Sequence, residues 1–271
     1  MTWEPDPATF LSGSHGYVRR RERLPRRAAD RLLDASLRRA LTRIDRLPSP
    51  SRDVLVVSVY RDGDRLARSL PELGSARLAF GAMGDAAPAL SPQTVATGLS
   101  GGKFPNLNRL VDAADWLVVV DDDVELPPRF LDRFLALCEH FDLALAQPAQ
   151  SLASHAAWPH ARRRPGALMR ETRFVEIGPV TAFRRDAAAV LTPFPDLRYG
   201  WGLDLAWAAV ALERRWRLGI ADAVAVRHEQ GGVASAYSSQ DAIAEARRFL
   251  STRPYLSAPA AAETLAVHRR L

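Results

Sequence analysis

Short runs of consecutive apolar residues alternate along the chain with stretches in which apolar residues recur at helical spacing. Residues 54–60 (VLVVSVY) and 116–120 (WLVVV) are the clearest runs. They lack helical spacing and indicate strands buried on both faces. Further strands are predicted at 76–82, 143–147, 174–183 and 221–227, and helices from about 64 to 70, at 104–113, from Pro127-Pro128 onward and at 204–216. This alternation predicts an α/β fold with a mostly parallel central sheet flanked by helices, where ligands bind at the carboxyl ends of the strands.

The first fifty residues have a different pattern. Apolar residues recur at helical spacing from Leu33 to Leu47, arginines occupy mainly the other faces, and Pro48 ends the pattern. Residues 1–50 hold 11 arginines and 6 acidic residues, whereas the rest of the chain holds 26 basic and 25 acidic residues. We favour a basic amphipathic helix that packs on the domain through its leucines. Contact of residues 26–46 with an anionic membrane or partner is the second interpretation. Nucleic acid is disfavoured, because no aromatic residues lie among the arginines.

The chain is predicted to comprise an Arg-rich helical extension (1–50), a catalytic-type α/β domain (51–250) and a C-terminal tail (251–271). Cys138 is the only cysteine, which excludes an intrachain disulfide and a zinc site built of thiolates. No apolar run is long enough to cross a bilayer, and the first residues lack a signal-peptide pattern. We therefore expect a soluble cytoplasmic protein, with peripheral membrane association through the basic helix as an option.

The basic residues are unusual in kind. Of the 37 lysines and arginines, 36 are arginine, and Lys103 is the only lysine. Schiff-base and pyridoxal-phosphate chemistry would therefore have to use Lys103. A P-loop is excluded, because Thr97 and Phe104 stand where that motif needs a glycine and a hydroxyl residue.

Asp121-Asp122-Asp123 follows the apolar run 116–120 directly. Three adjacent carboxylates at the end of a buried strand repel one another, and a divalent cation would offset that cost. In extended backbone Asp121 and Asp123 share a face, and such oxygen ligands favour Mg²⁺ or Mn²⁺ with positions left for substrate phosphates. A solvated acidic turn is the alternative, and the position after a strand favours a metal and phosphate site.

The sequence resembles the glycosyltransferases of the GT-A fold, whose Asp-x-Asp motif ends a central strand and holds the metal-bound diphosphate of a nucleotide sugar. The resemblance covers roughly residues 52 to 235. Five segments carry it, namely 57–62 (VSVYRD), 102–108 (GKFPNLN), 118–131 with the paired acids, 178–185 (GPVTAFRR) and 199–204 (YGWGLD). The last segment departs from the family pattern, because Leu205 stands where a second acidic residue often follows Asp204.

The resemblance implies roles for individual residues. Asp204 would be the catalytic base of an inverting enzyme, and Asp121, Asp123 and His228 would bind the metal. Residues that would bind the nucleotide sugar are Val59, Tyr60, Arg61, Lys103, Asn108, Asp121, Asp122, Trp201 and Gly202. The run Arg162-Arg163-Arg164 is expected to be solvated, with contact to an anionic acceptor or to the diphosphate as the alternative.

The expected function is metal-dependent transfer of a sugar from a nucleoside-diphosphate donor to an acceptor hydroxyl, with inversion and with Mn²⁺ or Mg²⁺ as cofactor. A phosphatase of the haloacid-dehalogenase type also has an Asp-x-Asp after a strand. It usually needs a later lysine, and none follows Lys103. A non-catalytic interaction module that uses the basic helix is the remaining alternative, although the candidate acids are all present.

Overall fold

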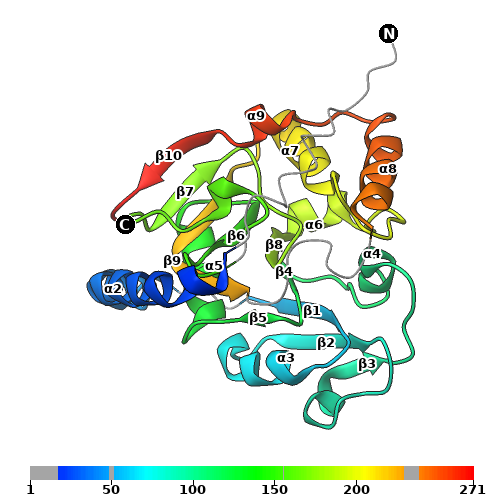
Figure 1. Ribbon diagram of the computed structural model, residues 1–271, viewed down its shortest axis with the longest axis horizontal. Coiled ribbons are helices and arrows are strands. Elements are labelled where there is room, and N and C mark those ends of the chain that lie inside the picture. The colour runs from blue at the N-terminus through cyan, green and yellow to red at the C-terminus, as the bar shows by residue number, and fades with distance from the viewer. Residues whose placement is uncertain (1–17, 49–51, 155, 229–237) are drawn as a thin grey trace.

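The computed structural model describes residues 18–48, 52–154, 156–228 and 238–271 (Figure 1). Its strands pair in the order β10-β7-β9-β6-β8-β4-β1-β2-β3, with β5 paired to β9. The strands are β1 (Val54–Tyr60), β2 (Arg77–Ala82), β3 (Thr94–Ala96), β4 (Trp116–Val120), β5 (Val124–Glu125), β6 (Leu145–Gln150), β7 (Met169–Thr172), β8 (Val180–Arg184), β9 (Leu218–His228) and β10 (Thr264–His268). Only β5, β7 and β8 of these strands run against the others. The mostly parallel sheet that the sequence predicts is therefore confirmed.

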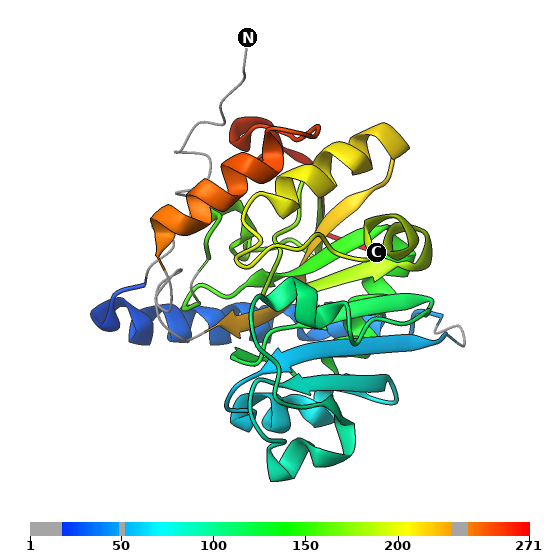
Figure 2. The same cartoon turned by 90° about the vertical axis from the view of Figure 1, so that its right-hand side faces the viewer.

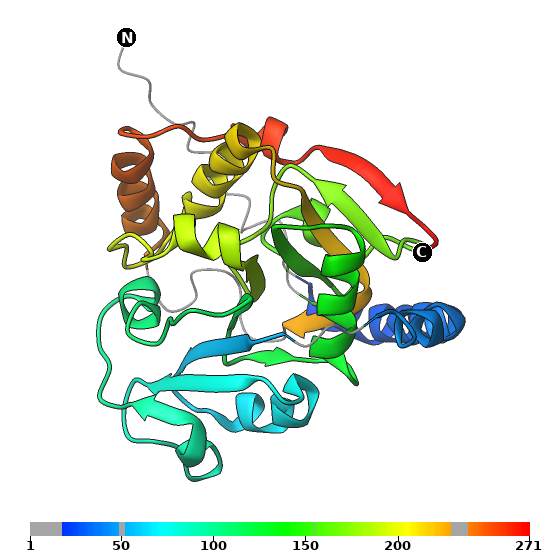
Figure 3. The ribbon, with the colours of Figure 1, turned by 180° about the vertical axis from the view of Figure 1, so that it is seen from behind.

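Helices cover both faces of this sheet, as the resemblance to the GT-A fold implies. They are α2 (Arg20–Ile44), α3 (Asp64–Ser69), α4 (Lys103–Leu107), α5 (Phe130–His140), α6 (Arg185–Leu191), α7 (Leu203–Arg214), α8 (Ser239–Leu250) and α9 (Ala258–Ala261), with short 3₁₀ turns at η2 (Leu70–Leu73), η3 (Pro88–Gln93) and η4 (Pro159–Ala161). Figure 2 shows α7 and α8 together above the strands, with α2 running across the middle of the view, and Figure 3 shows α5 in front of the sheet.

Alternate residues of the central strands supply two separate apolar cores. Val56 of β1 and Val118 of β4 belong to the core under α2, α3 and α5. Val57 and Val119, the next residues along, belong to the core under α4, α6, α7 and α8. Side chains alternate across a strand, so a run that is apolar throughout is what a sheet covered on both faces needs.

Several predicted elements differ from the structure. The helix predicted at 104–113 ends at Leu107, and turn hydrogen bonds from Leu110 and Val111 to the Leu107 carbonyl follow it. Pro127-Pro128 do not open α5, which begins at Phe130. Arg129, at a left-handed φ of 57°, separates the prolines from the helix, and its N–H donates to Glu72 at 2.6 Å.

The remaining differences between predicted and observed elements arise where strands pair with segments far away in the sequence. The long loop predicted at 150–173 contains β7, and the predicted tail contains β10, which pairs with β7 as the outer strand. The sheet therefore continues past residue 250. Of the strand predicted at 174–183, only the part from Val180 onward is strand. An edge pairing between segments some ninety residues apart leaves no local periodicity to detect.

Two residues of the arginine run 162–164 are less solvated than expected, whereas Arg164 is exposed as expected. Arg162 donates to the carbonyls of Leu152 and Ser154, at 3.1 and 2.9 Å. Arg163 is buried and forms ion pairs with Asp30 and Asp34 of α2. Arg163 therefore joins this loop to the N-terminal helix. None of the helices in the described ranges is both long and apolar enough to span a bilayer.

Candidate active site at the carboxyl end of the sheet

The acidic triplet, the end of β1 and the end of β9 meet at one edge of the sheet. The backbone N–H of Arg61, which follows β1, donates to Asp122 Oδ2 at 2.9 Å, because β1 and β4 are parallel neighbours. Residues 124–125 then pair with β9 in a register that sets Val124 opposite His228. The predicted convergence of Asp121–Asp123 with His228 is therefore present in the structure.

Each carboxylate of the triplet has its own partner. Lys103 Nζ lies 2.5 Å from Asp121 Oδ1, Asp122 accepts from Arg61, and Asp123 Oδ2 lies 2.9 Å from His228 Nε2. Burial, together with the two flanking charges, raises the pKa of Asp122. The protein itself thus offsets part of the negative charge of the triplet, whereas the sequence predicts a bound divalent cation in that role.

Asp123 and His228 form the best candidate metal pair. Burial opposes the ionisation of Asp123, but the His228 ring and Lys103 outweigh it and lower the pKa of Asp123. Burial likewise opposes protonation of His228, and the carboxylates of Asp123, Asp121 and Glu176 outweigh it and raise the pKa of His228. Both side chains are 25% exposed. A carboxylate oxygen and an imidazole nitrogen are donors that suit Mn²⁺, and two protein ligands leave positions for phosphate oxygens.

Asp121 is less suited to that role as it stands, since Lys103 holds it. Among the described residues, no group of three or more His, Cys, Asp or Glu side chains is arranged to hold a metal. The residues present therefore fit a metal ion that has two protein ligands and receives its remaining ligands from a bound diphosphate.

Lys103 connects the triplet to the segment before β8. Its ammonium also donates to the Ile177 carbonyl at 3.3 Å, and its side chain keeps 30% exposure. Gly178 lies against this ion pair, because a Cβ there would be 2.7 Å from Asp121 Oδ2 and 3.4 Å from Lys103 Nζ. The lone lysine thus lies within the acidic site, with its side chain partly exposed.

Asp204 lies in the first turn of α7, after Gly202, which caps the helix at a φ of 85°. The carboxylate is 6% exposed and accepts from the Leu205 N–H at 3.0 Å. Burial raises the pKa of Asp204 to about 7, and the nearby charge of Glu176 adds to that rise. The protonation of Asp204 therefore changes near neutral pH, which suits a group that takes up a proton.

Glu176 is a site residue that the sequence reasoning missed. It is 4% exposed, and Oε1 accepts from the Trp158 N–H at 3.0 Å while Oε2 accepts from Gln147 Nε2 at 3.3 Å. Burial raises the pKa of Glu176 to about 7. Its charge acts on both Asp204 and His228, so it lies near both candidate centres. An acid isolated between apolar residues in 174–180 (FVEIGPV) is the signal that could have revealed it.

The other residues predicted to bind the donor have mixed positions. Val59 is half-buried and Trp201 is half-buried against the core under α7. Tyr60 is fully buried on the opposite face, where its hydroxyl lies 2.7 Å from Thr94 Oγ1. Both polar atoms of the Asn108 amide bond the Phe194 backbone, each at 2.7 Å. The side chains of Tyr60 and Asn108 are therefore committed to holding the fold.

Loop 197–202 leads into α7, which carries Asp204, and it packs directly on α4, which begins at Lys103. Gly200 has a φ of 77°, and a Cβ there would lie 2.0 Å from Phe104 Cε2. We expect Gly200→Ala to lower the free energy of unfolding by roughly 2–4 kcal/mol, from a left-handed alanine plus overpacking. Gly98→Ala is the matched control, since Gly98 has a φ of 61° with nothing within 4 Å. Chemical denaturation should give a clearly smaller loss for the control, and equal losses would refute the close contact.

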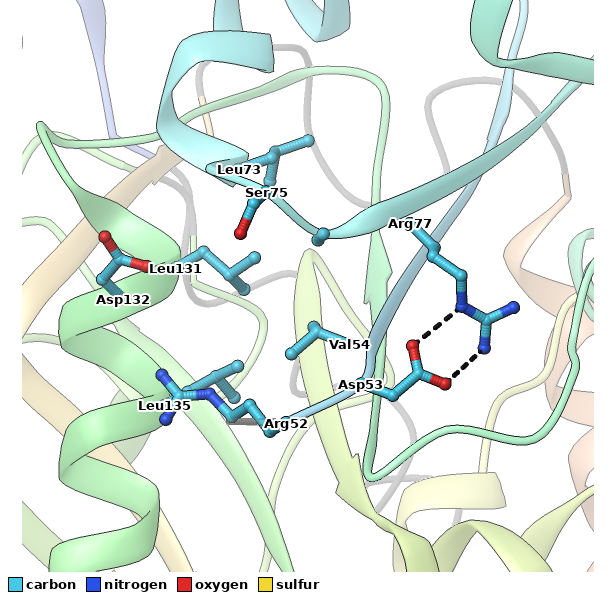
Figure 4. Close-up of a pocket in the computed structure, with 10 residues that line it drawn as sticks. Arg52, Asp53, Val54, Leu73, Ser75, Arg77, Leu131, Asp132 and Leu135 are labelled. Carbon is cyan, nitrogen blue, oxygen red and sulfur yellow. Dashed lines mark hydrogen bonds and ion pairs between the residues drawn. The ribbon is translucent and has the colours of Figure 1, made fainter. Parts of the chain in front are cut away.

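A pocket of about 310 Å³ lies at the opposite edge of the sheet, beside the amino ends of β1 and β2 (Figure 4). Three of the charged residues that line it are paired: Arg77 binds Asp53 through two contacts of 2.8 Å, and Arg52 binds Glu139 at 2.7 Å. Strand direction separates this pocket from the acidic triplet, so it is not part of the candidate site.

No protein-family model matches the chain, and no curated protein matches its sequence. The solved structures to which it is similar include the following two. A crystal structure of GalNAc-T7 with UDP, GalNAc and Mn²⁺ matches 71% of this chain and 48% of that chain, with 11% identity and a TM-score of 0.48. A crystal structure of TarS 1-349 from S. aureus in complex with UDP-GlcNAc matches 73% of this chain and 65% of that chain, with 14% identity and a TM-score of 0.48. The chain thus spans less than two thirds of the length of either protein.

Proposed function

We propose that the protein is a glycosyltransferase that moves a sugar from a nucleoside-diphosphate donor to an acceptor hydroxyl with inversion. The observation that carries the proposal is the pair of Asp123 and His228, 2.9 Å apart beside the acidic triplet at the carboxyl end of β4. A site of this kind suits a metal-bound diphosphate, because a metal ion would offset the charge of the carboxylates and its open positions would take phosphate oxygens.

We assign a role in binding or proton transfer to each of the following residues. Asp123 and His228 would hold Mn²⁺ or Mg²⁺, which supplies charge neutralisation to the departing diphosphate when bound. Lys103, held by Asp121 and the Ile177 carbonyl, would turn its exposed side toward the donor. Arg61, exposed at the end of β1, and Trp201, ahead of α7, would contact the nucleoside and a sugar ring. Asp204 would accept the proton of the attacking hydroxyl.

A turnover screen tests this proposal. The protein is incubated with a panel of nucleotide sugars and hydroxyl acceptors, with Mn²⁺ or with a chelator, and release of nucleoside diphosphate is measured. The proposal requires release from donors of one nucleotide base, dependent on the divalent ion and on an acceptor. Release of inorganic phosphate from simple phosphate esters instead would favour the phosphatase alternative.

The buried pair of Asp204 and Glu176 predicts a pH dependence. Transfer should rise with pH through about 7, as Asp204 loses its proton. We expect Glu176→Gln to move the midpoint of this rise to lower pH, because it removes the nearby like charge that raises the pKa of Asp204. The pH profile of kcat/KM measures the shift. Glu139→Gln is the control, because Glu139 is a half-buried carboxyl with a raised pKa that bonds Arg52 and Trp116 away from the site. An unchanged midpoint in Glu176→Gln would contradict the coupling.

A further inference from the structure

Helix α2 is held to the domain along one face. Asp30 is buried, and its carboxylate accepts from the N–H groups of Leu152 and Ala153 at 2.9 and 3.0 Å. Leu37 and Ile44 are buried in the core beside α5. Near the end of the helix, Asp45 binds Arg133 through two contacts of 2.8 and 2.9 Å. These anchors fix which side of α2 faces outward.

The outward face carries an apolar stripe that the core does not use. Leu24 is 75% exposed and Leu32 is 73% exposed. Ala28 and Ala35 are also exposed, and the four positions lie three or four residues apart, so they share one side of the helix. The leucines predicted to pack inward lie on the other side. Leu24 and Leu32 therefore have no partner in the described part of the domain that would bury them.

Exposed arginines flank this stripe on both sides. By helical spacing Arg20, Arg31 and Arg38 lie along one border and Arg43 lies on the other, while Arg21 and Arg39 continue the line of the stripe beyond its two ends. The exposed acid within α2 is Asp34, and Arg163 pairs with it at 2.7 Å. The outward face is thus apolar along its middle and positively charged at its borders. Figure 1 shows α2 at the edge of the molecule, away from the centre of the sheet.

We propose that the outward face of α2 binds the surface of an anionic lipid bilayer. Leucines between rows of arginines match the layering of such a surface, where acyl chains lie beneath headgroup phosphates. Nucleic acid offers phosphates but no apolar layer for Leu24 and Leu32. This inference does not depend on the proposed sugar transfer.

Vesicle flotation of the full chain tests the inference. Vesicles of phosphatidylcholine alone are compared with vesicles in which about a third of the lipid is phosphatidylglycerol. We expect co-flotation with the anionic vesicles only, weakened by high salt. Replacing Arg31, Arg38 and Arg39 with glutamine should lower partitioning roughly 100-fold, at about fivefold for each arginine. Replacing Leu24 and Leu32 with serine should lower it by roughly tenfold or more for each leucine.

The matched control replaces Arg68, Arg109 and Arg248, which are exposed outside α2, with glutamine. This control changes the net charge by the same amount as the triple arginine variant of α2, and it should keep most of the vesicle binding. Thermal melting verifies that all variants fold. Equal loss in this control, equal flotation with neutral vesicles, or no flotation would each overturn the proposal. The proposal would also be overturned if the chain forms an oligomer without lipid and the two serine substitutions convert that oligomer to a monomer. The outward face of α2 would then bind a second copy of the chain.

Discussion

Asp204→Asn is expected to lower the rate of sugar transfer by about 10³-fold while leaving the binding of nucleoside diphosphate unchanged. General-base catalysis contributes roughly 10²–10⁴-fold, and asparagine keeps the shape of the side chain but accepts no proton. The carboxylate lies in the first turn of α7, and it is Asp123 and His228 that are expected to hold the metal and its diphosphate. Steady-state kinetics give the rate, and calorimetry gives the affinity for the nucleotide.

Two controls separate a lost base from a damaged fold. Asp196→Asn changes an exposed acid in the loop that precedes α7 and should leave transfer unchanged. Asp204→Asn itself should not lower the free energy of unfolding above pH 7. Folding raises the pKa of Asp204 from 3.8 to about 7, so the fold loses stability as pH rises from the lower value to the higher one, and asparagine removes that penalty. Preserved turnover in a folded Asp204→Asn variant would remove Asp204 from the mechanism.

Asp123→Asn is expected to weaken metal-dependent nucleotide binding by at least about 100-fold. Removing a residue that only orients a metal ligand typically lowers metal affinity by about 10- to 100-fold, so a larger loss indicates a ligand. The substitution removes one of two candidate ligands, and it takes from His228 the carboxylate that lies 2.9 Å away. Titration of the protein with Mn²⁺ in the presence of a nucleoside diphosphate measures the loss.

The neighbouring residue provides the control for that experiment. Asp122 bonds the Arg61 N–H, so its expected donor contact runs through Arg61 and not through the metal. Asp122→Asn should therefore keep its Mn²⁺ response even where its affinity for the nucleotide falls. If Asp123→Asn also responds to Mn²⁺ like the unchanged protein, the metal binds elsewhere and the assignment of this pair is wrong.

The sequence predicts those parts of the fold that depend on local pattern. The runs at 54–60 and 116–120 became β1 and β4 with the expected bounds, because a strand buried on both faces is apolar throughout. The expected meeting of Asp121–Asp123 with His228 also holds, since parallel strands end at one edge. The resemblance pointed to Lys103 as a donor-side cation, and the structure brings it to 2.5 Å from Asp121.

What the sequence did not reveal depends on contacts between distant segments. Asn108 belongs to a matching motif, yet its amide is taken by Phe194, which lies 86 residues away. Glu176 has no motif, and its importance arises because Gln147 and Trp158 enclose it beside Asp204. The strand β10 is visible only through its pairing with β7. Such side-chain partners are set by tertiary packing, which periodicity does not encode.

Thermal denaturation with a panel of nucleoside diphosphates, each with and without Mn²⁺, tests most directly whether the acidic edge of the sheet is a donor site. A ligand that binds only the folded protein raises the melting temperature, and the rise grows with the logarithm of its concentration relative to Kd. The predicted result is a rise with one nucleotide base, seen only when Mn²⁺ is present and lost in Asp123→Asn but not in Asp122→Asn. No metal-dependent rise with any nucleoside diphosphate would contradict the proposed function.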